Sequence, residues 1–117
     1  MRYLLLIYGE ESGWQNLGEE ELGPILDDYW ALDDALRESG NYLASEPLQP
    51  TATATSVRVR EGKTVITDGP FAETKEQLGG FYMVEASDVD EAIAIAARIP
   101  GARTGTIEVR PIHELTR

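Results

Sequence analysis

The sequence contains no cysteine, and this absence excludes two large classes of small protein. Neither a disulfide scaffold nor a thiolate metal site can form without it, and the usual structural zinc patterns require it. Histidine is almost absent too, because His113, four residues before the C-terminus, is the single copy. No pair of histidines has the spacing of metal ligands, so we expect neither a metal nor another cofactor.

Basic residues are scarce, since 10 Lys and Arg stand against 21 Asp and Glu and give a net charge of −11. Binding to duplex nucleic acid depends on basic side chains that neutralise phosphates, so a nucleic-acid partner is not expected. No apolar run approaches the roughly 20 residues that span a bilayer. The N-terminus also lacks the basic and apolar regions of a signal peptide. We therefore expect a cytoplasmic protein without a membrane partner.

The sequence does contain enough hydrophobic residues for one real core. It has 117 residues, of which 42% are hydrophobic, and this length fits a single domain over residues 1–117. The acidic residues are concentrated, because residues 10–46 hold eleven of them and only Arg37 as a base. This segment is either a solvated helix surface that keeps the protein soluble or a docking surface for a basic partner.

The spacing of apolar residues predicts the element order β-α-β-hairpin-β-α-β. The first helix should begin at Pro24 and end before Gly40, with Ile25, Tyr29, Leu32 and Leu36 facing the core. The second should span residues 88–99, with Ser87 as its N-terminal cap and a core stripe at Val89, Ala92, Ile93, Ala96 and Ile99. The other predicted elements are strands at 2–8, within 41–50, at 81–86 and 104–112, and a hairpin of 56–60 and 64–67.

The hairpin is the clearest local pattern, because residues 56–60 alternate cleanly between apolar and polar side chains. We expect one of its faces to be buried and the other to carry Arg58 and Arg60. In the last strand, Ile107 and Val109 should share one face. Thr106, Glu108 and Arg110 should share the other.

Two helical crossovers between strands of one antiparallel sheet describe a ferredoxin-like plan with an inserted hairpin, an α+β fold. Right-handed crossovers place both helices on the same sheet face, which leaves the opposite face bare. Residues 4–8 and 81–84 carry large side chains on both faces, so the bare face would be a large apolar patch. We therefore expect a homodimer whose sheets pack face to face around a partly polar cavity.

The turn from Asp68 to Phe71, followed by Glu73, Lys75 and Glu76, has the highest density of candidate functional groups. Pro70 fixes its own φ, Gly69 is free to take a positive φ, and Asp68 can hydrogen-bond to the backbone ahead of it as a structural turn. Alternatively the turn lies at the mouth of the cavity. Asp68 is then a partly buried carboxylate with a raised pKa, Phe71 a wall and Lys75 an anion contact.

Three further features admit two interpretations each. Arg110 and Glu108 either line the cavity or form ion pairs across the dimer. His113 is either a general base or a solvated residue of the tail. Gly79 and Gly80 indicate a close backbone approach or a bulge at the start of a strand.

The segment from Val57 to Arg60 and the long motif from Thr67 to Tyr82, TDGPFAETKEQLGGFY, resemble the DGPF branch of the YCII-related family. The opening residues 3–9 and closing residues 108–112 are similar to it as well, so the resemblance covers essentially the whole chain. It implies a ferredoxin-like fold that pairs into a dimeric α/β barrel. Genes of this branch often lie beside, or are fused to, genes for extracytoplasmic-function sigma factors.

A distant YCII-like branch includes a chlorohydroxymuconate dehydrochlorinase and proteins with a His–Asp pair. The resemblance places Tyr29 at the position of that histidine in the first helix, and Glu38 near the position of the acid. This sequence has no histidine in the helix, so it departs from the pattern of that enzyme. His113 lies at the other end of the chain.

Two main hypotheses follow. The first is a dimer that binds a small molecule through Tyr29, Asp68, Phe71, Lys75 and Arg110. If this dimer is an enzyme, we expect acid–base catalysis on a small organic acid, with Asp68 as the catalytic group. The second is an interaction module whose acidic first helix docks a basic surface, for example on a sigma-factor-like regulator. A structural dimer without a ligand is a third interpretation.

Overall fold

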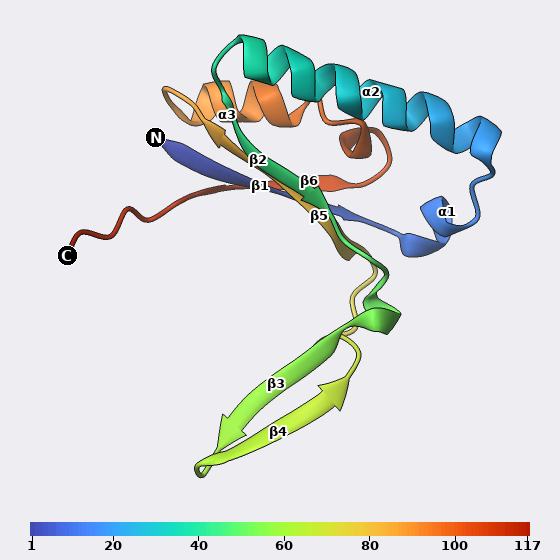
Figure 1. Cartoon of the computed structure of the whole chain (residues 1–117), viewed down its shortest axis with the longest axis vertical. Helices are drawn as coiled ribbons and strands as arrows, with labels where there is room; N and C mark the ends of the chain where they lie inside the picture. The colour runs from blue at the N-terminus through green and yellow to red at the C-terminus, as the bar shows by residue number, and fades with distance from the viewer.

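Strand β1 (Arg2–Gly9) lies inside a four-stranded antiparallel sheet with the order β2-β5-β1-β6. The computed structural model describes residues 1–117, and Figure 1 shows its elements. The neighbouring strands are β2 (Tyr42–Pro47), β5 (Gln77–Glu85) and β6 (Thr106–Pro111). The fold is therefore mixed α+β, and its strand order is consistent with the ferredoxin-like plan expected from the sequence.

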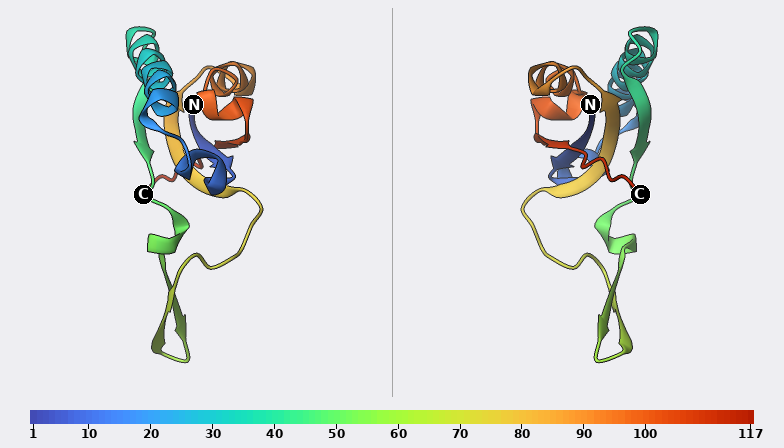
Figure 2. Two further views of the ribbon diagram at one scale, coloured as in Figure 1. Left: turned by 90° about the vertical axis from the view of Figure 1, so that its right-hand side faces the viewer. Right: turned by 90° about the vertical axis from the view of Figure 1, so that its left-hand side faces the viewer.

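Both long helices cover the same face of this sheet, as expected (Figures 1 and 2). They are α2 (Glu19–Glu38) and α3 (Val89–Ala96). The short elements are α1 (Glu11–Gln15) and the 3-10 turns η1 (Thr51–Thr53) and η2 (Pro100–Arg103). None of the helices combines the length and the apolar character that crossing a membrane demands.

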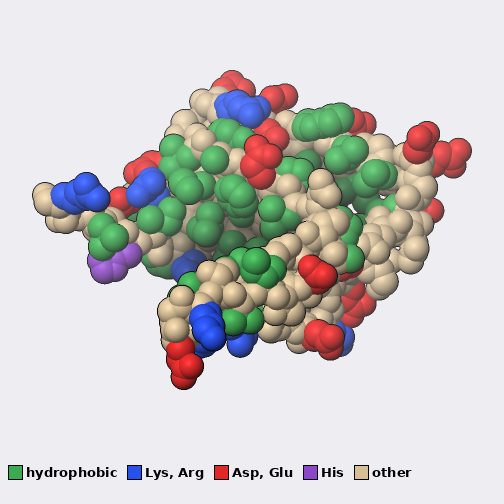
Figure 3. Space-filling model, turned by 60° about the horizontal axis from the view of Figure 1, so that its bottom comes forward, with side chains coloured by type: hydrophobic (Ala, Val, Ile, Leu, Met, Phe, Trp, Pro, Cys, Tyr) green, Lys and Arg blue, Asp and Glu red, His purple; other side chains and the backbone are tan.

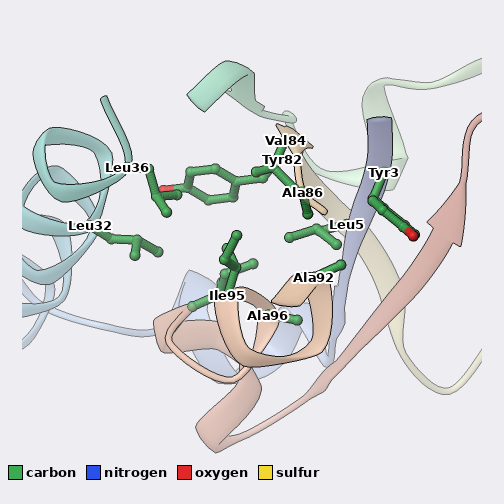
Figure 4. Packing of buried hydrophobic residues seen from close by; sticks show 11 residues of the cluster. Tyr3, Leu5, Leu32, Leu36, Tyr82, Val84, Ala86, Ala92, Ile95 and Ala96 are labelled. Carbon is green, nitrogen blue, oxygen red and sulfur yellow. The ribbon is translucent and has the colours of Figure 1, made fainter. Parts of the chain in front are cut away.

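The hydrophobic core lies between this sheet face and the two helices. The ring of Tyr82 points from β5 toward Leu36 of α2, and Leu5 points from β1 toward the residues of α3 (Figure 4). The buried cluster consists of Tyr3, Leu5, Leu32, Leu36, Tyr82, Val84, Ala86, Ala92, Ile95, Ala96 and Ile99. The predicted stripe of the first helix is confirmed at Leu32 and Leu36, which are buried, and at Tyr29, which packs against the cluster. Ile25 is only half-buried and lies outside the cluster.

Helix α2 begins five residues earlier than predicted, so Pro24 lies inside it. Its first turn carries Glu19, Glu20 and Glu21, whose charges are favourable next to the partial positive charge of a helix N-terminus. A proline this close to the start of an exposed helix removes one backbone hydrogen bond and leaves the rest of the helix intact.

Helix α3 differs from the prediction in its cap and in its buried stripe. Asp88, not Ser87, is the cap, because its carboxylate accepts a hydrogen bond of 2.9 Å from the Glu91 amide. Ile95 is buried, whereas Val89 and Ile93 are exposed. Apolar residues of this helix recur at both i+3 and i+4 spacings, so the sequence fits more than one buried face. The position of the sheet decides which face of the helix is buried.

Strands β3 (Thr55–Arg60) and β4 (Lys63–Asp68) form a separate two-stranded sheet, here called the arm (residues 55–68). Its two-residue turn has positive φ at both Glu61 and Gly62, the geometry that matches the twist of a hairpin. The predicted hairpin is confirmed. The predicted buried face is wrong for the single chain, since the arm extends away from the rest of the molecule and contains no buried residue (Figure 1).

Candidate functional site

The sheet face opposite the helices, here called the open face, has no covering element. Figure 3 shows hydrophobic side chains gathered over this side of the molecule, with the arm coming toward the viewer. Strand register places Leu4 and Leu6 of β1 on this face, beside Phe81 and Met83 of β5. All four are only partly buried. The open face therefore has an apolar centre that lacks a partner within the chain.

One end of the open face holds a wide depression of about 450 Å³ with polar walls. It is lined by Tyr8, Thr74, Glu76, Thr106 and Glu108. The Thr106 hydroxyl donates a hydrogen bond of 2.9 Å to a carboxylate oxygen of Glu76. The depression is thus lined by two carboxylates, one phenol and two hydroxyls. These groups can accept hydrogen bonds from a ligand that carries hydroxyl or amino groups.

The sequence predicted only part of this depression. Alternation in the last strand correctly placed Thr106, Glu108 and Arg110 on one face, and Ile107 and Val109 on the other. Tyr8 was missed as a site residue, and Glu76 was counted among the charged residues after the turn without a role in the site. Tyr8 could be assigned to the same face by alternation from Leu4 and Leu6, whereas Glu76 lies in a loop and carries no periodic signal.

Arg110 lies on the open face, as expected, but its guanidinium is engaged. Its Nη2 forms an ion pair of 2.6 Å with Glu108 within the same strand. Within the single chain this pair occupies Arg110, and the pairing across a dimer that the sequence left open stays a prediction. Arg110 therefore neutralises one of the two carboxylates beside the depression and is not a free anion contact in the single chain.

Tyr29 lies on the opposite side of the sheet from Arg110. Its hydroxyl accepts a hydrogen bond of 3.1 Å from the Gly101 amide, and its pKa is raised, mainly because burial disfavours the phenolate. The chain therefore does not bring Tyr29 and Arg110 together in one pocket. Glu38 is exposed at the end of α2, and His113 is exposed in the tail.

The turn after the arm has the predicted backbone and different side-chain surroundings. Gly69 takes a φ of +92°, and its amide donates a hydrogen bond of 2.7 Å to Ala54. Asp68 is exposed and its carboxylate makes no hydrogen bond, so neither the turn bond nor the partly buried carboxylate is found in the single chain. Phe71 is 80% exposed, and Lys75 is exposed as well.

A smaller groove of about 260 Å³ lies along one face of the arm. Arg58 contributes a cation that forms no ion pair, and Phe71 and Pro70 also line the groove. The other lining residues are Ser56, Val65 and Thr67. Asp68 pairs with Thr55 and so projects from the other face of the arm. The structure thus places Phe71 beside Arg58 rather than beside Asp68 or Lys75.

A partly buried contact between α2 and β5 was not predicted from the sequence. The Tyr82 hydroxyl donates a hydrogen bond of 2.5 Å to Asp33, and the Tyr82 ring packs edge-on against Tyr42 at 6.4 Å. Burial raises the pKa of Tyr82, and the Asp33 carboxylate raises it further. This contact joins helix to sheet. No three His, Asp or Glu side chains lie close enough together to hold a metal ion.

Comparisons with known proteins identify the family of this chain. The sequence matches the YCII-related domain over residues 1–116. It is also 39% identical over 114 residues to an uncharacterised protein of Rhizobium meliloti (strain 1021), a match that covers 96% of this chain and 92% of that protein. The chain therefore belongs to the YCII-related family.

Proposed function

We propose that this protein is a homodimer that binds a small organic ligand in a cavity between two open faces. The apolar centre of the open face carries this proposal, because Leu4, Leu6, Phe81 and Met83 would otherwise stay in contact with water. Two sheets that pack face to face would cover these side chains and would form the dimeric α/β barrel that the family resemblance implies.

The depression at the end of the open face supports the ligand. A second sheet packed on the apolar centre would roof this depression and turn it into a cavity with an apolar floor and a polar wall. Glu76 and Glu108 are hydrogen-bond acceptors, and Arg110 already neutralises Glu108. The wall therefore favours a neutral or cationic ligand with hydroxyl or amino groups over the organic acid expected from the sequence.

Acid–base catalysis, if the cavity supports it, falls to Glu76, Glu108 and Tyr8, the ionisable groups that line the depression. Asp68, Phe71 and Lys75 remain proposed ligand contacts. They lie on the arm and on the loop that follows it, so a second copy would supply them to the cavity.

A thermal-shift screen tests the ligand. Small polyols, amines and carboxylates are compared on the wild type, Glu108→Gln and Asp68→Asn, because a ligand that binds the native state raises the melting temperature. We expect a hydroxyl or amino compound to stabilise the wild type and to lose its effect in Glu108→Gln. A wild type that responds to no compound, or equal responses in all three proteins, would refute the ligand site.

A second candidate function is docking of a basic protein by α2. Leu22, Leu26 and Trp30 recur every four residues on this helix and are exposed, Trp30 to 58%. Acidic residues surround them, and an exposed tryptophan in such a stripe is typical of an interface anchor. The partner we propose is a sigma-factor-like regulator with a basic, partly apolar surface.

Titration with a purified extracytoplasmic-function sigma factor tests this docking. Affinity should fall at least about tenfold between roughly 50 and 300 mM salt, since the Debye length shortens over this range. Trp30→Ala should weaken binding, whereas the exposed Leu115→Ala in the tail serves as a matched control. Absent binding, or binding that ignores salt and Trp30, would rule out the acidic docking surface.

A further inference from the structure

The two faces of the arm differ in chemical character. Val57 and Val59 of β3 share one face with Ile66 of β4, because Val57 pairs directly with Ile66. These three side chains are 60%, 61% and 65% exposed. The opposite face carries Arg58, Arg60 and Lys63. The arm is thus an amphipathic ribbon with an unpartnered apolar side.

The chain itself does little to stabilise the arm. No hydrogen bond or ion pair joins residues 55–68 to the main sheet or its helices. A two-stranded hairpin alone in water is at best marginally stable, and three or more strands or a packed surface are needed for order. The exposed apolar face therefore calls for a covering surface from outside the chain.

The direction of the arm identifies a second copy as that surface. The arm extends on the side of the sheet away from the helices, which is the side of the open face (Figures 1 and 3). A second copy that covers the open face would therefore lie beside the arm.

The distribution of charge agrees with this choice of partner. The arm holds three basic and two acidic residues, a net +1, whereas the rest of the chain holds seven basic and nineteen acidic residues, a net −12. A basic arm and an acidic body attract each other when they belong to different copies.

We infer that the arm clasps a second copy of the chain and buries Val57, Val59 and Ile66 against it. The inference rests on the proposed homodimer and adds a second contact surface to it, separate from the open face. It also explains how a second copy can bring Phe71 and Asp68, at the base of the arm, to the cavity.

Sedimentation equilibrium on the full chain tests the clasp. The triple variant Val57→Thr, Val59→Thr, Ile66→Thr keeps β-branched side chains, and so strand propensity, and removes apolar surface. We expect its dimer dissociation constant to rise at least about tenfold. The matched control is Val65→Thr on the other face of the arm, which should change the constant less than about threefold.

The outcomes separate the two proposals. A wild type that is a monomer would overturn the homodimer and with it the clasp. A wild-type dimer whose dissociation constant is the same in the triple variant would overturn the clasp alone.

A second measurement does not depend on a destabilising variant. Because the chain has no cysteine, Lys63→Cys near the arm tip creates a single attachment point for a spin label on the basic face. Labelled chains are mixed with isotope-labelled wild-type chains that carry no spin label, and the amide signals of the latter are recorded. Broadening confined to one region of the second copy supports the clasp. Signals that broaden no more than with free label would overturn it.

Discussion

The indole ring of Trp14 lies directly on Gly79, so that a Cβ added to Gly79 would come within 2.7 Å of the ring. Gly9 meets the same ring, and a Cβ added there would lie 2.8 Å from the nearest ring carbon. The two glycines lie on neighbouring strands next to the bulge between β1 and β5. Helix α1 is thereby held against the end of the sheet at which the arm begins.

Gly79→Ala should destabilise the protein by about 1–3 kcal/mol, because the added methyl group forces the indole or the strand to move. The matched control is Gly23→Ala in α2, where a Cβ meets nothing within 4 Å and helix propensity should give about 0.5–1 kcal/mol of stabilisation. Urea unfolding measures both changes. Gly79→Ala should also cost less in a Trp14→Ala background, and an equal cost in both backgrounds would contradict this contact.

Tyr82→Phe should destabilise the fold by about 1–3 kcal/mol, because the part-buried carboxylate of Asp33 loses a hydrogen-bond donor. The variant should also change the alkaline limb of stability. The folded-state pKa of Tyr82 lies above its ordinary value of 10.0, so the unfolded state loses its proton first and stability falls as the pH rises above about 10.

Unfolding measured between pH 9 and 11 checks this effect. Tyr82→Phe should flatten the decline. A residual slope is expected from Tyr29, whose pKa is also raised by burial. An unchanged slope in Tyr82→Phe would show that the phenol of Tyr82 does not control the alkaline limb.

Glu91→Gln should flatten the acid limb of stability. The carboxylate of Glu91 accepts hydrogen bonds of 2.7 Å from Ser87 and from Asn41, and these lower its pKa below the ordinary 4.5. The resulting stabilisation is complete above pH 4.5 and is lost as the pH falls through the lowered value. The free energy of unfolding is measured as the pH is lowered, for this variant and for Asp90→Asn. The second variant is the control, because the Asp90 side chain makes no hydrogen bond. Identical acid limbs in Glu91→Gln and the wild type would be inconsistent with this role.

Glu11→Ala should loosen the base of the arm. The Glu11 carboxylate accepts hydrogen bonds from the amide and hydroxyl of Thr51, at 2.7 and 2.9 Å, and the Glu11 amide donates one to Gln77. Loss of a cap of this kind costs about 0.5–2 kcal/mol. Hydrogen exchange should accelerate at residues 51–55, and Glu10→Ala is the matched control. Equal exchange in the two variants would exclude a capping role for Glu11.

The sequence was most informative where a local pattern decides the structure. The hairpin, the freedom of Gly69 to take a positive φ and the strand faces around Ile107 follow from local chemistry and alternation, and all were predicted. The hairpin turn is one residue shorter than predicted, because Lys63 belongs to β4. The bulge and close approach expected at Gly79 and Gly80 are both present, because Gly79 meets Trp14 and Gly80 meets the Glu46 carbonyl. A glycine pair at the start of a strand indicates such a feature but does not identify the residues that it contacts.

The sequence was least informative where contacts between distant residues determine the structure. The choice of Ile95 over Ile93 as a buried residue depends on where the sheet lies, and the hydrogen bond from Tyr82 to Asp33 joins elements 49 residues apart. The candidate site was only partly predicted for the same reason. Tyr29 and Arg110 fall on opposite sides of one sheet, and Glu76 reaches the depression from a loop without a periodic pattern.

Light scattering on the wild type and on Leu6→Lys measures whether a second copy covers the open face. A lysine at this position can pair with Glu108 on the neighbouring strand of a monomer, but it would place a charge inside a sheet-to-sheet interface. We expect a wild-type mass of twice 12.9 kDa and a mass of 12.9 kDa for a folded Leu6→Lys variant, while the tail variant Leu115→Lys stays dimeric. A wild type of 12.9 kDa would mean that no second copy covers the open face.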